Sequence, residues 1–308
     1  MGRIYYLVDQ RRIAGGIKVA YRHVATLRRN GLDAVIVHRV AERPDWFAVP
    51  DIPIAGFSEL TFEAADVVVM PEDARHTLRT MAGLPPRKVM FCQNHFYLAS
   101  GLVETRDPRR LGIEAVMTSG DEITRFLRWR LPDLPLSTVH LAIDPDLYRP
   151  LPEKRLQVAA VPRKRPFEYR FIRDLINFGY PASDRFGWVE LTDASEAEVA
   201  QAMADSAVFL SLARLEGVGL TGLEAMACGC AVTGFLGGGG REFATAENGW
   251  WAADDDCVTA GRQLAACLRA VLEGTAASRV AAGQATAARY TLEREESELL
   301  AFWRGFLG

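Results

Sequence analysis

The sequence predicts an α/β protein with two Rossmann-like domains, each built on a parallel sheet. Three observations support this fold class. The chain has 308 residues, which suits two domains of about 150 residues better than one. Short apolar runs alternate with amphipathic stretches along most of the chain, a pattern typical of parallel strands joined by helices. A polar, proline-rich segment at 144–152 interrupts this alternation near the middle and predicts a linker.

The first half opens with the pattern of a buried strand followed by a helix. Residues 4–8 are apolar or aromatic, and Gly15-Gly16 then opens an amphipathic stretch that runs to about Asn30. Gly31 is the residue type that commonly ends a helix. Further strands are predicted at 34–37, 67–70, 89–92, 116–118 and 136–140, with a helix at 121–130.

The same alternation restarts after the linker. Ser195 and Glu198 have the spacing of a capping box, which predicts the start of a helix that runs to about Asp205. Beyond residue 258 the pattern is mostly helical, with a break near Gly274. Strands are predicted at 156–161, 186–189, 208–212 and 231–233, and helices at 167–178 and 221–227.

The composition excludes several classes of function. Apolar residues make up 49% and charged residues 24% of the chain, as in ordinary globular proteins. The formal net charge of −3 provides no global field that would recruit nucleic acid. No apolar run is long enough to span a membrane, so we expect a cytoplasmic protein. Arg125, Arg128 and Arg130 alternate with Phe126 and Trp129, which suits either a helix on the inner face of the membrane or one that packs its apolar side inward.

Neither a metal site nor a cofactor is expected. The five cysteines lack the spacing of a zinc site, and Cys228-Gly-Cys230 fits small packed residues better than a redox pair. The acidic runs at 144–146 and 254–256 suit a linker and the start of a helix better than a cation site.

Glu216 and Glu224 flank a glycine-rich turn between an apolar strand and a short helix. Such a turn offers backbone N–H groups and the positive end of a helix dipole to an anion, while the carboxylates suit hydroxyl groups. A sugar nucleotide has both parts. We expect Glu224 to bind the ribose, Glu216 the transferred sugar, and the amides near Gly219 and Leu220 the phosphates. Alternatively, Glu224 only completes a capping box with Thr221.

Two further glycine-rich segments follow predicted strands. Gly15-Gly16 resembles half of a phosphate loop, although many helices simply begin after glycine. The run 237–240, which includes Gly239, suits a loop that closes over the sugar or the phosphates, with Glu242 on a sugar hydroxyl. The alternative for this run is a surface loop without function.

Cations and a histidine also stand directly after predicted strands. Arg163, Lys164 and Arg165 would neutralise a diphosphate leaving group, or they form a solvated charge cluster. His95 lies in a loop that would face the cleft between the domains, where a functional and a structural role are both open.

The stretch Glu216-Gly-Val-Gly-Leu-Thr-Gly-Leu-Glu-Ala-Met-Ala-Cys-Gly resembles the two-glutamate signature of retaining glycosyltransferases of family 4, the group 1 transferases. That signature usually reads E-G-F-G-L-P-x-x-E-A-M-A-C-G. Other matching segments follow in the expected order, among them His95-Phe-Tyr-Leu-Ala-Ser-Gly and Ile143-Asp-Pro-Asp-Leu-Tyr-Arg-Pro. Val218 and Thr221 depart from the usual Phe and Pro, and the Arg and Lys of 163–165 stand closer together than in the family.

The resemblance implies a GT-B fold, in which two Rossmann-like domains face each other across a cleft. Residues 1–150 would form the acceptor-side domain, 151–290 the nucleotide-sugar donor domain, and 291–308 a helix that packs back toward the first domain. Catalytic roles are expected for Glu216, His95, Arg163 and Lys164. The predicted donor-binding residues are Glu224, Gly217, Val218, Gly219, Leu220, Thr221, Gly15, Gly16, Arg165, Gly239 and Glu242.

The sequence therefore predicts a retaining, metal-independent glycosyltransferase. It would move a sugar from a nucleotide diphosphate to a hydroxyl of a saccharide, a lipid-linked saccharide or a small metabolite. Two alternatives stay open, namely an epimerase or hydrolase of sugar nucleotides on the same scaffold, and a nucleotide-binding subunit without catalytic activity. Incubation with the donor alone distinguishes the first alternative from transfer.

Overall fold

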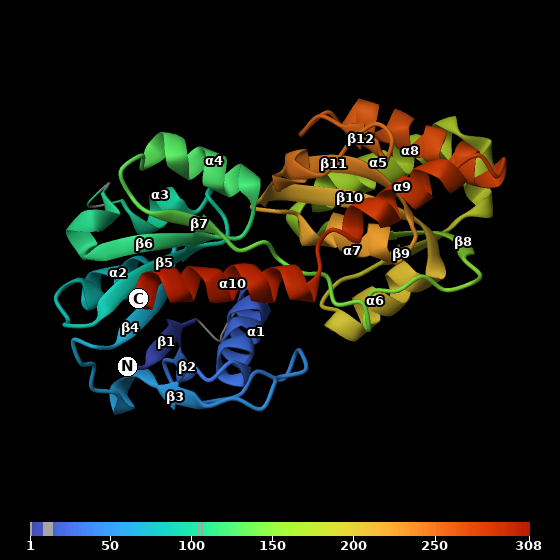
Figure 1. Ribbon diagram of the computed structural model, residues 1–308. Helices are drawn as coiled ribbons and strands as arrows, with labels where there is room; N and C mark the ends of the chain where they lie inside the picture. The colour runs from blue at the N-terminus through green and yellow to red at the C-terminus, as the bar shows by residue number, and fades with distance from the viewer. Residues whose placement is uncertain (1, 9–14, 104, 106) are drawn as a thin grey trace. The chain divides into compact units, whose positions relative to one another are not determined.

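The computed structural model describes residues 2–8, 15–103, 105 and 107–308 (Figure 1). The chain forms two compact units: unit 1 comprises Met1–Leu141 and Glu293–Gly308, and unit 2 comprises Ala142–Leu292. The division thus falls before the proline-rich segment and not after residue 150. This segment belongs to unit 2, because Ile143 N–H bonds to the Tyr290 carbonyl oxygen and the buried Tyr148 hydroxyl donates to Glu196.

Unit 1 is built on a seven-stranded sheet in the order β3-β2-β1-β4-β5-β6-β7, and every pairing described is parallel. The six predicted strands are confirmed. The seventh, β3, was not predicted because it is a three-residue edge strand with little apolar pattern. The strands are β1 (Ile4–Leu7), β2 (Ala34–His38), β3 (Ile54–Gly56), β4 (Val67–Pro71), β5 (Arg87–Cys92), β6 (Ile113–Thr118) and β7 (Leu136–Thr138).

The last helix of the chain belongs to unit 1. On α10, Glu295 is almost completely buried and accepts hydrogen bonds from Arg22 on α1. Trp303 is fully buried, with its ring centroid 6.4 Å from that of Tyr6 on β1. Burial of an aromatic surface of this size explains why the terminal helix joins the first unit. The helices of unit 1 are α1 (Gly15–Arg29), α2 (Arg75–Ala82), α3 (Leu98–Gly101), α4 (Asp121–Arg130) and α10 (Leu292–Leu307).

Unit 2 is built on a five-stranded parallel sheet in the order β12-β11-β10-β8-β9. Helices α5 and α8 pack on one face, and α6, α7 and α9 lie on the other (Figure 1). The predicted capping box is confirmed, since Ser195 and Glu198 exchange hydrogen bonds at the start of α6. The strands are β8 (Arg155–Ala160), β9 (Gly187–Glu190), β10 (Ser206–Glu216), β11 (Ala231–Gly238) and β12 (Trp250–Ala252). The helices are α5 (Pro166–Gly179), α6 (Glu196–Asp205), α7 (Leu220–Ala227), α8 (Cys257–Leu272) and α9 (Ala277–Ala287).

The strand order of unit 2 reverses between β8 and β10. The chain runs from β8 outward to β9, then returns through α6 to β10 on the other side of β8. Open α/β sheets bind ligands outside the carboxyl ends of the strands at such a switch point. The two-domain α/β fold predicted from the alternation is confirmed, and its topology indicates where a ligand belongs in unit 2.

Candidate active site

Three neighbouring strands of unit 2 end where the donor-binding residues were predicted. Because β8, β10 and β11 are adjacent and parallel, their carboxyl ends lie at one edge of the sheet. β8 leads into the 3-10 turn η3 (Pro162–Lys164), β10 ends at Glu216, and β11 leads into the 3-10 turn η5 (Gly239–Glu242). Three loops that are distant in sequence therefore meet at the switch point.

Lys164 and Glu216 form an ion pair at this edge. Lys164 Nζ lies 2.7 Å from Glu216 Oε1, and it also donates to the carbonyl oxygen of Arg214 at 3.2 Å. The two side chains keep 25% and 28% of their surface exposed, so a ligand can reach both. Their predicted partners are the diphosphate and the sugar of one donor, and the fold places both charges side by side.

A β-bulge sets the direction of Glu216. Ala213 pairs with Leu236 and Glu216 with Gly238, so two residues of β10 lie opposite one residue of β11. Leu215, inside the bulge, has a φ of 50°, which costs a non-glycine residue about 1–2 kcal/mol. Bulges redirect side chains, and strained backbone of this kind clusters at functional sites. The pattern of apolar residues predicted a strand that stops at 212, so this feature was missed.

The two glycine-rich loops pack directly on each other. A Cβ atom on Gly239 would lie 2.4 Å from the carbonyl oxygen of Gly217, a distance that no side chain permits. Gly219 has a φ of 85° and precedes the first residue of α7, Leu220. The close approach and the positive φ explain why both loops need glycine. Val218, which replaces the usual Phe of the signature, is buried at 3% exposure.

Helix α7 begins differently from the capping-box alternative. Its cap position is Gly219, and among the described residues none caps the helix with a side chain. Thr221 therefore lies within the first turn, half-exposed, and does not form a capping box with Glu224. Gly222 N–H donates to the Gly219 carbonyl oxygen at 3.1 Å. The N–H groups of Leu220 and Thr221 are therefore the ones that this first turn offers to an anion, where the helix dipole favours negative charge.

Glu224 is held by a buried tyrosine that the sequence had assigned to the linker. The Tyr148 hydroxyl contacts the Glu224 carboxylate and donates to Glu196 Oε1 at 3.4 Å. Burial, followed by the negative charges of these two glutamates, raises the pKa of Tyr148 above its ordinary value. Tyr148 is therefore neutral, and its single hydroxyl proton serves the two neighbouring carboxylates, Glu196 and Glu224.

Arg163 and Glu242 occupy the outer part of the same edge. Arg163 is exposed in η3, next to Lys164. Glu242 is half-buried in η5 and accepts a hydrogen bond from the Tyr290 hydroxyl at 3.2 Å. Both side chains thus lie on loops that follow β8 and β11, as the sequence predicted for contacts to phosphate and sugar.

Arg165 has different surroundings from the two cations before it. Its side chain is only 2% exposed and pairs with Asp254 and Asp255 at 3.3 and 2.5 Å. It also donates to the carbonyl oxygen of Ala213 at 2.9 Å, and Asp254 accepts from Gly237 N–H at 2.9 Å. The guanidinium therefore ties β10 to the glycine loop of β11. In this arrangement Arg165 supports the site from inside, and Arg163 and Lys164 present their charges outward.

Replacing Arg165 by Met is expected to lower the free energy of unfolding by up to about 3–5 kcal/mol, because a buried cation that links two acids is lost. Arg163→Met is the matched control, since its side chain is exposed and should change stability by less than about 0.5 kcal/mol. Urea unfolding followed by tryptophan fluorescence measures both values. Equal losses in the two variants would contradict the supporting role of Arg165.

In unit 1, Gly16 contacts the loop that carries His95. Gly15 and Gly16 are the first residues of α1, and the carbonyl oxygen of Gly16 accepts from Gln93 Nε2 at 3.1 Å. Gln93 directly follows β5, two residues before His95. The imidazole of His95 lies against two phenylalanine rings. Its centroid is 4.2 Å from that of Phe96 and 5.0 Å from that of Phe126. Residues 9–14, which precede the glycine pair, lie outside the described part of the chain.

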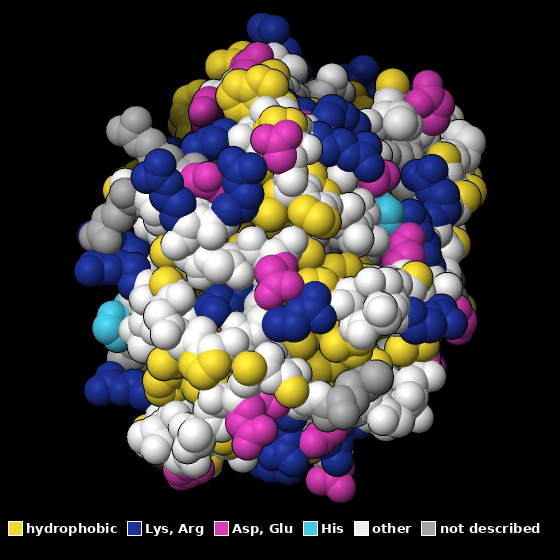
Figure 2. All heavy atoms as spheres, turned by 60° about the vertical axis from the view of Figure 1, so that its left-hand side comes forward, with side chains coloured by type: hydrophobic (Ala, Val, Ile, Leu, Met, Phe, Trp, Pro, Cys, Tyr) yellow, Lys and Arg dark blue, Asp and Glu magenta, His cyan; other side chains and the backbone are white. Residues whose placement is uncertain are grey.

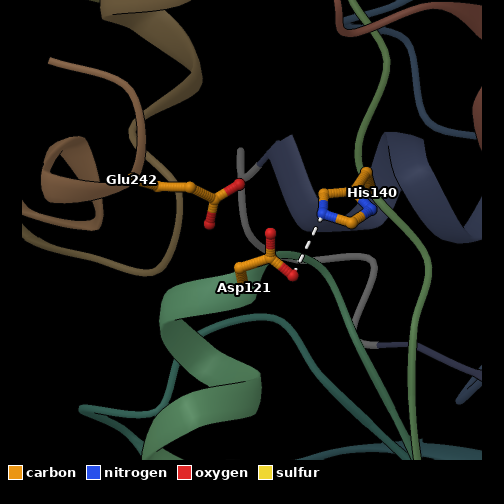
Figure 3. A group of neighbouring side chains, drawn as sticks. All are labelled: Asp121, His140 and Glu242. Carbon is orange, nitrogen blue, oxygen red and sulfur yellow. Dashed lines mark ion pairs between the residues drawn. The ribbon is translucent and has the colours of Figure 1, made fainter.

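His140 and Asp121 are polar groups at the same sheet edge that sequence reasoning missed. They follow β7 and β6, and His140 Nε2 lies 3.4 Å from Asp121 Oδ1 (Figure 3). His140 is buried, and its Nδ1 lies 2.9 Å from Glu298 Oε2 on α10. Their position just after neighbouring strands is the signal that could have found them. This pair gives the carboxyl edge of unit 1 a hydrogen-bonding capacity suited to hydroxyl groups.

The acidic run 254–256 and the pair Cys228 and Cys230, which were not expected to bind metal or to carry redox chemistry, are tied into helix ends and the protein interior. Asp256 accepts from Thr259 N–H at the start of α8, as expected of a capping residue. Cys228 and Cys230 are buried, and burial raises their thiol pKa values to about 12 and about 11. Thiols with such pKa values are poor nucleophiles at neutral pH.

The part of the chain that the structure describes contains no helix of the length and hydrophobicity that crossing a membrane requires. On α4, Ile123 and Leu127 are buried, which agrees with inward packing, while Trp129 is 77% exposed. On the face drawn in Figure 2, basic side chains are interspersed with acidic and hydrophobic ones.

Comparison with known proteins defines the class. A family model described as "Glycosyl transferases group 1" matches residues 168–273, which lie within unit 2. The chain is also 28% identical over 245 residues to an alpha-1,6-glucosyltransferase of Actinobacillus pleuropneumoniae serotype 7 (strain AP76). This alignment covers 76% of the chain and 72% of that relative.

Solved structures share the fold over the whole chain. A glycosyltransferase from Rickettsia africae has a TM-score of 0.71 at 12% identity, covering 99% of this chain and 98% of that one. HepE of Anabaena in complex with UDP-glucose has a TM-score of 0.68 at 15% identity, covering 99% and 100%. Sucrose-phosphate synthase of Thermosynechococcus elongatus has a TM-score of 0.68 at 14% identity, covering 99% of each chain. At these identities the likeness concerns the fold. Together with the matched domain and the named relative, it identifies a glycosyltransferase with the GT-B fold.

Proposed function

We propose that this glycosyltransferase is a retaining, metal-independent enzyme that uses a nucleotide-diphosphate sugar. The observation that carries the proposal is the Lys164–Glu216 ion pair, which lies beside the uncapped start of α7 and the two packed glycine loops. Cations and N–H groups at one point suit a diphosphate, and a carboxylate at the same point suits the hydroxyls of the attached sugar. Unit 2 is thus the donor-binding unit.

The proposed chemistry relies on charges that are in place before the reaction. As the bond from the sugar to the diphosphate breaks, negative charge grows on the leaving group and the sugar becomes oxocarbenium-like. Lys164, Arg163 and the first turn of α7 stabilise the leaving diphosphate, because preorganised donors need little reorganisation during the reaction. Glu216 binds sugar hydroxyls and holds the donor in the reactive position. Lys164 exchanges its contact with Glu216 for one with phosphate when the donor binds.

Glu224 is the proposed ligand of the ribose. A carboxylate accepts hydrogen bonds from two vicinal hydroxyls, and Glu224 is half-buried on α7, where it contacts Tyr148. Glu242 and the amides of Gly217, Gly239 and Leu220 complete the proposed donor contacts.

The acceptor is assigned to unit 1. His95, together with the Asp121–His140 pair, offers groups at the carboxyl edge of its sheet that can orient an acceptor hydroxyl. Gly15 and Gly16 would contribute backbone groups to the same edge. We also propose that the enzyme works in the cytoplasm, where a lipid-linked acceptor would be met at the inner face of the membrane. A saccharide or a small metabolite is the alternative acceptor.

Thermal-shift measurements with UDP-, GDP-, ADP- and TDP-sugars test donor binding, since a ligand of the native state raises the unfolding temperature. UDP-glucose is the first donor to test, because HepE was solved with it and the named relative is a glucosyltransferase. Proton NMR of the product then reports the anomeric configuration. Inversion, or hydrolysis that is as fast without acceptor as with it, would contradict the proposal.

Activity in excess EDTA should equal activity in buffer alone, because the leaving charge is assigned to side chains and amides. Initial rates with and without the chelator measure this, with added Mg²⁺ as the reference condition. A loss that Mg²⁺ restores would assign part of the leaving-group stabilisation to a cation instead.

A further inference from the structure

The outer face of α5 exposes large apolar side chains. Phe167, Phe171 and Phe178 are 78%, 47% and 94% exposed, and Leu175 is 36% exposed. The opposite face packs into the core of unit 2 through Tyr169, Ile172 and Ile176. Single exposed apolar residues are ordinary, but three phenylalanines on one short helix form a patch of the kind that marks an interaction site.

The exposed residues have a regular arrangement along the helix. Phe167, Phe171 and Leu175 follow each other at intervals of four and form one row. Arg170, Asp174 and Phe178 form the neighbouring row at the same interval. All three side chains of this second row are exposed.

This arrangement is self-complementary when two copies of α5 pack antiparallel about a two-fold axis near residues 172 and 173. The axis brings Phe167 of one copy opposite Phe178 of the other, and Phe171 opposite Leu175. Arg170 of each copy then lies within about one residue rise, roughly 1.5 Å along the axis, of Asp174 of the other. Two-fold interfaces pair the same patch on both subunits in this way.

We propose that α5 is the surface through which two copies of this chain associate. The charges of the helix favour a second copy over a lipid surface, because Arg170 and Arg173 are balanced by Glu168 and Asp174. An anionic membrane attracts helices with a basic excess, which α5 does not have. A two-fold pair instead places Arg170 of each copy next to Asp174 of the other.

The proposed dimer is reversible. A helix of 14 residues is about 21 Å long, so one helix pair buries less surface than the roughly 1,200–2,000 Å² of stable complexes. Dissociation in the micromolar range is expected. Sedimentation equilibrium from low micromolar to several hundred micromolar protein should therefore show a monomer–dimer equilibrium.

Charge reversal tests the pairing directly. Arg170→Asp and Asp174→Arg, each alone, place like charges opposite each other and should weaken the dimer by about tenfold or more. The double variant Arg170→Asp/Asp174→Arg restores opposite charges and should return dimerisation close to the wild-type value. Phe178→Ser should also weaken the dimer, whereas Trp129→Ser, which removes a 77% exposed aromatic from unit 1, should leave it unchanged.

Each outcome decides the proposal. It is overturned if the wild-type protein stays monomeric over the whole range, or if the double reversal dimerises no better than the single ones. Monomeric protein that sediments with anionic phospholipid vesicles through Phe178 would assign the surface to a membrane instead. Thermal unfolding of each variant confirms that a lost dimer reflects the surface and not the fold.

Discussion

Replacing Glu216 by Gln is expected to lower turnover with the true donor by at least about a hundredfold, the loss typical of removing one preorganised group. Gln keeps the size of the side chain but loses the charge that binds the sugar hydroxyls and that pairs with Lys164 at 2.7 Å before the donor binds. Lys164→Met should have an effect of similar size, because the leaving diphosphate then loses its nearest cation. Initial rates at saturating donor measure both variants.

The two effects should not add. Since Lys164 and Glu216 contact each other, the double variant Lys164→Met/Glu216→Gln should be less impaired than the product of the single losses predicts. Glu190→Gln is the matched control, because Glu190 is an exposed acid at the carboxyl end of the edge strand β9. It should retain wild-type rates. Near-wild-type turnover of Glu216→Gln would remove the central support for the proposed function.

Glu224→Gln is expected to weaken binding of the nucleoside diphosphate by about 10- to 100-fold, the value of hydrogen bonds to a charged group. It should also remove most of the preference for the ribonucleotide over its 2′-deoxy analogue, because the ribose hydroxyls lose their acceptor. Tyr148→Phe should reduce this preference in part, since Glu224 is then no longer held in position. Calorimetric titration with both nucleotides measures the ratio.

The comparison separates two possible errors. If Glu224→Gln keeps the full preference, the ribose contact is wrong. If Glu224→Gln loses it while Tyr148→Phe keeps it, the ribose contact stands and the positioning role of Tyr148 is wrong. Glu196→Gln, which changes the other partner of Tyr148, serves as the control and should keep both affinity and preference.

Elements with a clear local pattern could be predicted from the sequence. Helix α1, the capping box of Ser195 and Glu198 on α6, and the longer buried strands all follow from apolar periodicity and from capping residues. The edge strands β3 and β12 were missed because each has only three residues, too few to show a period. β10 was predicted too short, because its last residues are polar and run through a bulge.

The candidate site was predicted in part for the same reason. Glycines flanked by acids directly after strands indicate where the backbone must approach a ligand. This pattern spans only a few neighbouring residues, so it can be recognised in the sequence. The different positions of Arg163, Lys164 and Arg165 could not be predicted, because three adjacent cations look alike until the fold buries one against Asp254 and Asp255. Tyr148 could not be recognised either, since its partners lie on α6 and α7.

By itself, the sequence determined two α/β units and the glycine-rich junction between Glu216 and Glu224, because periodicity, caps and turn residues act over a few neighbouring positions. Only the tertiary structure decided which charges meet. Lys164 and Glu216 become partners because β8 and β10 are neighbours in the sheet, and a bulge turns the last residue of β10 toward η3. Strand order and bulges result from the packing of the whole unit. They therefore cannot be predicted from the residue pattern of a short stretch of the chain.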